Sequence, residues 1–288
     1  MAPIEDISST HPELLSKERY YISSSSKTSS YLLPADEEEA ERLNAQSQAI
    51  IELFDSKLVW VPITLQDGNI VLDSGTGSGH WLLSLVKELK NNASGLNIQL
   101  MGIDITPRMF PPLPSTPPNT TFIVKSITSL PAFWTSTISL IHQRLLMVAL
   151  QSSQWHSALS EMYRVLKPGG WIQLFEPNHH FISPLPEIVN HRALQLRNKL
   201  SLEIRHVTLD IVDHLPEWLA RYGFINLKIE KKGLPMGSWA EPVMEEGKGF
   251  GLVKSGEEYD QVIEEFEKLC EETPGTYFEY WVFTAQKP

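Results

Sequence analysis

The sequence predicts a doubly wound α/β fold, in which a mostly parallel sheet is covered by helices on both sides. Two observations lead to this prediction. Short apolar runs typical of strands alternate along the chain with longer segments whose apolar residues recur at helical spacing. In addition, a glycine-rich turn follows the first apolar run and opens a helical segment, which is the unit on which such folds bind ligands.

Seven apolar runs are predicted to be strands. Several are rich in β-branched and aromatic residues, which suit a pleated and partly buried surface. In chain order they cover residues 70–72, 98–105, 121–126, 138–143, 170–176, 224–232 and 277–285.

Helical patterns separate several of these runs. Residues 31–54 form an amphipathic segment whose start is crowded with acidic residues, where the helix dipole favours them. Residues 155–166 end at a Lys-Pro-Gly-Gly run, and residues 215–222 end before a glycine, and both are typical helix stops. A further helix is predicted to begin at Ser255, where Glu258 completes a capping box.

Two insertions interrupt the alternation near the predicted carboxyl edge of the sheet. Residues 184–213 have a helical pattern, and residues 233–255 are rich in Gly, Pro, Met and Trp. Ligands bind at this edge in doubly wound sheets, so we expect the insertions to wall a substrate pocket. Residues 1–30 are rich in serine and predict a flexible tail, which leaves residues 31–288 as one domain. The aromatic residues expected at the pocket rim are Trp155, Phe181, Trp239 and Phe250.

The composition excludes some classes of partner. The chain has 288 residues and a net charge of −11, and an acidic surface repels the phosphates of nucleic acids. No apolar run is long enough to span a bilayer, and the first residues do not resemble a secretory signal. The single cysteine, Cys270, follows a helical pattern and is interpreted as a packing residue. We therefore expect a cytoplasmic protein with neither nucleic acid nor membrane as a partner.

The strongest chemical signal is the glycine-rich turn, Asp73-Ser-Gly75-Thr-Gly77-Ser-Gly79. Its glycines allow a tight turn and close approach of a ligand, and the helix that follows offers free N–H groups. A dinucleotide-binding fingerprint fails here, because His80 stands where its last glycine would be.

Two acids complete this signal. Asp104 ends the next predicted strand, at what we expect to be an open strand end, and can accept hydrogen bonds from both ribose hydroxyls. Asp73 can face a cationic amino group. Together they suit a nucleoside that carries an amino acid, whereas the alternative is a tight turn without a ligand and a surface Asp104.

These motifs resemble those of a known family. VLDSGTGSGHW resembles motif I of the class I S-adenosylmethionine-dependent methyltransferases, and GIDIT resembles their motif II. ISLIHQRLL and WHSALSEMYRVLKPGGWIQLFEP resemble their fourth strand and the helix and strand that follow. YLLPADEEEAERLNAQ, HQRLL and GLPMGSW are similar to a fungal branch, the LaeA-like methyltransferases of secondary metabolism.

The resemblance implies a Rossmann-like seven-stranded sheet with an antiparallel last strand, and S-adenosylmethionine as the cofactor. The glycine turn would then hold the methionyl end and Asp104 the ribose. The residue that usually contacts adenine is acidic in the family, but it aligns here with Ser126, which weakens the expected hydrogen bond. The predicted cofactor-binding residues are Asp73, Gly75, Thr76, Gly77, Gly79, Asp104, Ile105, Ser126, Ile127 and His142.

Methyl transfer from a sulfonium is a direct displacement that depends on alignment, and a protonated acceptor also needs a general base. His179 and His180 directly follow the fifth predicted strand, so we predict that one of them is the catalytic base, and His180 is favoured over His179. His80 and His142 are further candidates, and each histidine has a purely structural role as its alternative. No cluster suggests a metal site. Arg144 either binds an acidic substrate or forms a structural ion pair, and the ion pair is favoured.

The predicted function is methyl transfer to an O, N or S atom of a small molecule in fungal secondary metabolism. The main rival function is that of a LaeA-like regulator in the nucleus that acts through protein partners. Two further hypotheses are a methyltransferase-like fold with another chemistry and a nicotinamide-dependent oxidoreductase, and the glycine spacing disfavours the oxidoreductase.

Overall fold

The computed structural model describes residues 37–288, except 93–95, 113–115, 200, 203–206 and 237–255. The predicted flexible tail and the first residues of the predicted 31–54 helix lie outside the described residues.

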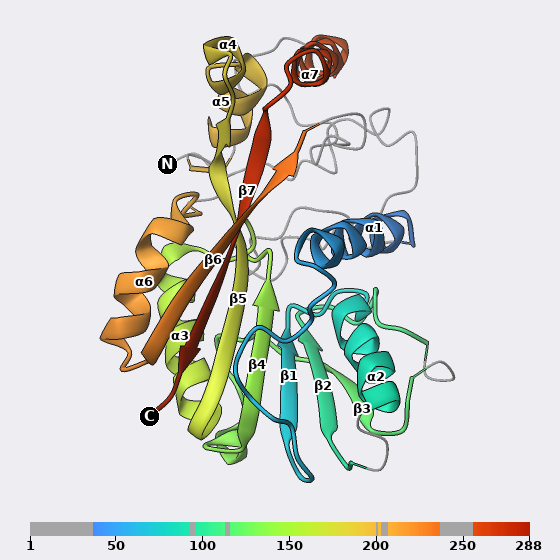
Figure 1. The fold of residues 1–288 in the computed structure, drawn as a ribbon, viewed down its shortest axis with the longest axis vertical. Helices are drawn as coiled ribbons and strands as arrows, with labels where there is room; N and C mark the ends of the chain where they lie inside the picture. Colours follow the sequence, from blue (N-terminus) through green and yellow to red (C-terminus); the bar gives the residue numbers. More distant parts are fainter. Residues whose placement is uncertain (1–36, 93–95, 113–115, 200, 203–206, 237–255) are drawn as a thin grey trace, which may run out of the picture.

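A single seven-stranded sheet forms the centre of the molecule, with strand order β3-β2-β1-β4-β5-β7-β6 (Figure 1). Strands β1 to β5 are parallel, and β7 runs antiparallel to both β5 and β6. The predicted doubly wound sheet with an antiparallel last strand is therefore confirmed. The strands are β1 (Ile70–Ser74), β2 (Gln99–Asp104), β3 (Thr120–Val124), β4 (Ile138–Arg144), β5 (Leu166–Ile182), β6 (Ile225–Pro235) and β7 (Tyr277–Gln286).

Helices cover both faces of this sheet because alternate strand residues point to opposite sides. Val71 packs with α2 (His80–Asn92) on one face, whereas Leu72 packs with α3 (Ser152–Val165) and α6 (Ile211–Arg221) on the other. The connection between β3 and β4 contains only a short 3-10 helix, η4 (Ala132–Trp134).

Helix α1 (Glu37–Leu53) lies across the carboxyl end of β1, above α2 (Figure 1). Ile50 packs against β5 and β7, and Ile51 packs against the cluster that includes α2. The predicted N-terminal amphipathic helix is thus present, and its inner face lies over the edge of the sheet where ligands bind in doubly wound folds.

Strand β5 is much longer than predicted. It already starts at Leu166, because Gly169 has a φ of +77° and lets the chain bulge before it pairs with β4 and β7. It also continues beyond Pro177, where the sequence predicts a loop, and pairs with β7 across a bulge between Pro177 and Phe181. Proline is tolerated at such a bulge, where ladder hydrogen bonds are interrupted. His179 and His180 therefore lie in a strand and not in a loop.

The far ends of β5 and β7 lead to a cap of three helices, drawn at the top of Figure 1: α4 (Pro186–Val189), α5 (Arg192–Lys199) and α7 (Gly256–Glu271). These helices share one apolar cluster, which contains Leu194, Phe266 and the buried Cys270. The prediction of a packing cysteine is confirmed.

The two predicted insertions are described to different extents. The first contributes α4, α5 and the start of α6, which begins at Ile211, four residues earlier than predicted. The second begins as part of β6, and residues 237–255, with Trp239 and Phe250, lie outside the described residues. In the part of the chain that the structure describes, no helix is both long enough and apolar enough to cross a membrane.

Candidate active site

The glycine-rich turn between β1 and α2 has a backbone that only glycine adopts easily. Gly75, Gly77 and Gly79 have φ angles of +66°, +52° and +73°. A Cβ on Gly75 would lie 2.8 Å from a Leu146 methyl carbon, and one on Gly79 would lie 2.7 Å from the Phe122 ring. The turn is therefore shaped by tertiary neighbours as well as by its own sequence.

Asp104 at the end of β2 is tied to this turn. Its Oδ2 accepts a hydrogen bond from the Gly77 amide at 3.0 Å, and its Oδ1 accepts one from the Thr106 amide at 3.3 Å. Burial raises the pKa of Asp104, although these bonds favour the charged form. The neighbouring Ile105 leaves 45% of its surface exposed, which provides an apolar face beside the carboxylate.

Asp73, directly before the glycines, is almost fully buried. Only 3% of its surface is exposed, and its Oδ2 accepts a hydrogen bond from the Thr76 hydroxyl at 2.6 Å. Burial raises its pKa to about 7, while the Thr76 hydrogen bond and the positive charge of Arg144 oppose this rise. Asp73 is thus a carboxyl group that a cationic ligand would ionise fully.

Helix α1 forms a wall above the turn. The Ser78 hydroxyl donates to Asn44 Oδ1 at 2.6 Å, and Ser47 Oγ lies 2.7 Å from His80 Nδ1. Arg144 also donates to the Ser47 hydroxyl. Asn44 and Ser47 were not predicted from the sequence, since nothing in the pattern of α1 distinguishes them from other polar residues of a surface helix.

The predicted ion pair of Arg144 is not found among the described residues and stays a prediction. Among the residues that the structure describes, no carboxylate lies within ion-pair distance of its guanidinium. Loss of solvation lowers the pKa of Arg144 to about 10, and the nearby Asp73 opposes this effect. Arg144 therefore remains a cation at neutral pH without a described acidic partner.

The residues predicted to contact adenine lie just beyond β3. The Ser126 hydroxyl lies 2.7 Å from Thr128 Oγ1 and accepts a hydrogen bond from the Thr128 amide at 3.2 Å. The Ile127 side chain is buried in the main core with 5% of its surface exposed. Ser126 thus starts a local turn, and the predicted contacts of Ser126 and Ile127 with adenine stay predictions.

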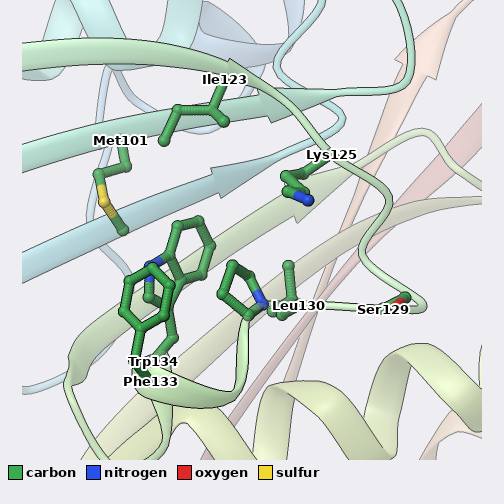
Figure 2. Close-up of a pocket in the computed structure, with 8 residues that line it drawn as sticks. Met101, Ile123, Lys125, Ser129, Leu130, Phe133 and Trp134 are labelled. Carbon is green, nitrogen blue, oxygen red and sulfur yellow. The ribbon is translucent and has the colours of Figure 1, made fainter.

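A shallow hollow lies on the sheet face next to this connection, as Figure 2 shows. Met101 and Ile123 form its floor on the face opposite α2, because η4 alone replaces a covering helix there. None of the predicted cofactor residues lines it. Its lining residues are Met101, Ile123, Lys125, Ser129, Leu130, Pro131, Phe133 and Trp134.

His142 lies inside the core and not at an open strand end, because β4 continues to Arg144. Its ring stacks on Trp81 at 3.8 Å and its Nδ1 lies 2.9 Å from Gln173 Nε2. Burial lowers its pKa well below the usual range, so the ring is neutral. Its predicted contact with the cofactor stays a prediction.

Trp155, predicted at the pocket rim, is fully buried in the core.

The two predicted catalytic histidines are brought together on β5, with ring centroids 3.6 Å apart. His179 is half-buried, and its Nδ1 has no hydrogen-bond partner in the described part of the chain. Burial, His180 and Arg197 lower the pKa of His179, so it is neutral and able to accept a proton. His180 is exposed.

Their position along the sheet limits what these histidines can reach. Arg144 at the end of β4 is paired with Phe175, so His179 lies four residues further along β5. At ~3.3 Å per residue, its Cα is about 13 Å beyond the level of Arg144. The two histidines therefore lie well beyond the carboxyl end of β4.

Glu176 is a buried acid near the glycine-rich turn that was not singled out from the sequence. It is fully buried, and its two oxygens accept hydrogen bonds from the Leu146 and Met147 amides, each at 3.0 Å. It thereby fixes the loop after β4, and with it the Leu146 side chain that packs on Gly75. An acid within the apolar run Trp-Ile-Gln-Leu-Phe-Glu was the available signal.

Within the described residues, no group of three or more His, Cys, Asp or Glu side chains converges as in a metal site.

Comparison with known proteins identifies the domain that carries this site. Residues 71–170 match the family model described as a methyltransferase domain. This segment of the chain is therefore similar to a methyltransferase domain. The match runs from β1 to the start of β5, and so includes the glycine-rich turn, Asp104 and Arg144.

Fungal relatives extend the match. The N-methyltransferase sirN of Leptosphaeria maculans is 39% identical over 150 residues, which is 51% of this chain and 50% of that protein. The N-methyltransferase tcpN of Claviceps purpurea is 29% identical over 211 residues, 70% of this chain and 71% of that protein. The alignment with sirN thus spans about half the length of each chain.

Among solved structures, YcgJ from Bacillus subtilis shares the fold, with a TM-score of 0.50 and 18% identity over 84% of this chain and 98% of that one. The predicted resemblance to methyltransferases is thus supported by the family model over residues 71–170 and by the fungal relatives.

Proposed function

We propose that this protein transfers a methyl group from S-adenosylmethionine to a nitrogen atom of a small molecule. The observation that carries the proposal is the placement of two acids, one buried and one partly buried, around the glycine-rich turn. Asp73 lies before the turn with 3% of its surface exposed, and Asp104 reaches it from the next strand through Gly77.

The residues present fit S-adenosylmethionine. Gly75, Gly77 and Gly79 give the turn a backbone that favours glycine and lets it approach its neighbours closely, and the Asp73 carboxyl has no cation at ion-pair distance among the described residues. Asp73 would accept from the ligand ammonium, Asp104 from the ribose, and Ile105 would contact the nucleoside. When bound, the cofactor supplies a methyl group already activated on a sulfonium.

The nitrogen acceptor is proposed from the relatives, because sirN and tcpN are both named N-methyltransferases. An amine reacts through its lone pair, so a protonated amine must first lose a proton. His179 is the better-placed base, since it is half-buried and neutral and its Nδ1 is unpaired in the described part of the chain. His180, next to it, would assist or line the acceptor pocket.

Two finer parts of the proposal rest on sequence motifs. HQRLL and GLPMGSW support membership of the LaeA-like branch, and hence a role in fungal secondary metabolism. We place the protein in the cytoplasm, with its small-molecule acceptor as the main partner. The acidic net charge of −11 is consistent with this placement and argues against nucleic acid as the acceptor.

Mass spectrometry with methyl-labelled S-adenosylmethionine tests the proposal. The purified chain is incubated with a metabolite extract of a fungus that lacks it, and labelled products are sought. We expect a labelled N-methyl compound with the wild-type chain and none with a Gly75→Val variant, whose side chain would collide with Leu146. Calorimetry gives the second criterion: binding of NAD without binding of S-adenosylhomocysteine would refute the cofactor assignment.

A further inference from the structure

Strand β6 forms one edge of the sheet. It is 11 residues long and pairs with β7 on one side, and no strand of the described residues lies on its other side. Three of its apolar residues, Ile225, Leu227 and Ile229, are 44%, 36% and 37% exposed. A long edge presents unpaired N–H and C=O groups, to which the strand of another chain can add. Covering the apolar side chains at the same time would add a hydrophobic gain.

Charged residues protect many sheet edges from such pairing, but two of the four charges on β6 are already engaged within the chain. The Lys231 ammonium lies 3.3 Å from the centroid of the Trp281 ring. Lys232 forms an ion pair with Asp55, which follows α1. These two lysines are therefore bound to groups of their own chain.

The other two charges on β6 are opposite in sign. Lys228 and Glu230 are exposed, and neither has an ion-pair partner among the described residues. They point to the same face of the sheet because they lie two residues apart. In an antiparallel pair of β6 strands related by a two-fold axis at Ile229, each Lys228 faces Glu230 of the second copy. An axis at any charged residue of β6 would instead place two identical charges opposite each other.

We propose that two copies of this chain pair antiparallel through β6, with the two-fold axis at Ile229. Such an interface is isologous, so each favourable contact occurs twice. The two Lys228–Glu230 pairs lie on one face of the joined sheet, and the Ile229 side chains meet on the other. The chain carries a net charge of −11, so two copies approach more easily where the surface is not acidic, and β6 has three lysines and one glutamate. Strands β7, β5 and β4 separate β6 from β1, so the interface does not involve the glycine-rich turn.

Charge reversal tests the register of this pairing. In sedimentation velocity, we expect the wild-type chain to shift from monomer to dimer as its concentration rises. Glu230→Lys and Lys228→Glu each place like charges opposite one another, so each should raise the dimer dissociation constant about tenfold or more. An equimolar mixture of these two variants should form a heterodimer, because every facing pair then has opposite signs. Glu264→Lys, at an exposed position on α7, is the control and should dimerise as the wild type does.

Cross-linking gives a second measurement. Residues on the axis face each other at Cα distances of about 4.5–5.5 Å, which suits a disulfide, so Ile229→Cys should give a covalent dimer under mild oxidation. Ile225→Cys, at another exposed position of β6, is the control, because its two copies would lie about 26 Å apart and should not cross-link. The native Cys270 is buried and does not compete.

A wild-type chain that stays monomeric at every concentration overturns the proposal. So does a dimer that both charge reversals leave intact, or one in which the two cysteine variants cross-link equally, because either result places the interface on another surface. If a charge-reversed variant does not fold, as judged by circular dichroism, the pair of cysteine variants decides.

Discussion

Single residues at the carboxyl ends of β1 and β2 combine ligand binding with support of the turn. Asp104 is the clearest case, because its two oxygens already accept the Gly77 and Thr106 amides. The sequence predicts an open strand end there, and the structure corrects this: the carboxylate also fastens the turn to β2.

Asp104→Ala should therefore affect both affinity and folding. We expect the affinity for S-adenosylhomocysteine to fall by ~2–4 kcal/mol and the free energy of unfolding to fall by roughly 1–2 kcal/mol, since each bond to a charged group is lost. Calorimetry and urea unfolding measure the two effects. Glu217→Ala, at an exposed position on α6, is the control. Unchanged affinity in a folded variant would remove Asp104 from the site.

The raised pKa of Asp73 predicts how the affinity for the cofactor depends on pH. Burial raises its pKa to about 7, so in the free protein it is largely protonated below that value. Only the charged form pairs with an ammonium group, so we expect affinity to fall by up to about tenfold per unit as pH drops below 7. Calorimetry in buffers of different ionisation enthalpy should also show proton release on binding. Proton release that persists in Asp73→Asn would assign it to another group.

At this scale, the contiguous part of the site could be predicted. The glycine-rich turn and Asp104 follow from a local motif, because the carboxyl ends of neighbouring parallel strands meet at one edge. Ser47 and Glu176 could not be found in this way, since they act through contacts with residues at least 29 positions away in the chain. The environment of Arg144 could not be predicted either, because its hydrogen-bond partner Ser47 is also distant in the chain.

Among the elements, β5 and the loop after β4 are joined by one buried acid. Burial raises the pKa of Glu176 to about 8 from an ordinary value of 4.5. A carboxyl with a raised pKa in the folded state stabilises the protein fully at low pH and loses this contribution as pH rises through the folded value. The stability that Glu176 contributes by holding the loop after β4 to β5 therefore depends on pH.

We expect the free energy of unfolding to decrease between pH 7 and 8 by up to about 1.4 kcal/mol per unit. Asp73 contributes a similar decrease only up to about pH 7, so the upper interval reports on Glu176. Glu176→Gln, which mimics the protonated acid, should flatten that interval. Urea unfolding at several pH values measures it, and an equally steep decrease in the glutamine variant would contradict the assignment.

The elements themselves were predicted with the right order but not the right lengths. Pro177 and the Lys-Pro-Gly-Gly run predict ends of β5, because both disfavour regular strands. In the folded chain, β7 supplies a partner on both sides of these positions, and Gly169 absorbs the bulge. Tyr280 pairs opposite Pro177 but lies 103 residues away in the chain, so the local sequence around Pro177 cannot predict this pairing.

The described part of the molecule consists of a sheet that carries the proposed cofactor site and a cap that β5 and β7 connect to it (Figure 1). Phe266 of α7 holds the cap together: its ring lies 5.4 Å from Phe181 at the end of β5 and 5.2 Å from His191. The glycine-rich turn lies in a separate apolar environment around α1 and α2.

Phe266→Ala should loosen the cap without disturbing the cofactor site. We expect it to destabilise the cap by about 3 kcal/mol and to lower kcat/KM for the acceptor at least tenfold, as alignment of the acceptor is lost. The affinity for S-adenosylhomocysteine should stay the same. Phe133→Ala, an 80% exposed aromatic far from the cap in the chain, serves as the control. A parallel loss of cofactor affinity would show that cap and sheet are not separate in function.

The position of helix α1 has a consequence for the rate at which the used cofactor is released. The helix crosses the glycine-rich turn and is fastened there by Asn44 and Ser47, so a nucleoside enclosed between the turn and α1 would leave only after these contacts open. Departure of the used cofactor would then be slower than the displacement step, as in many enzymes whose lids set the pace. A rapid first round of methylated product, followed by a slower steady rate, is the kinetic trace that a chain closed in this way should leave.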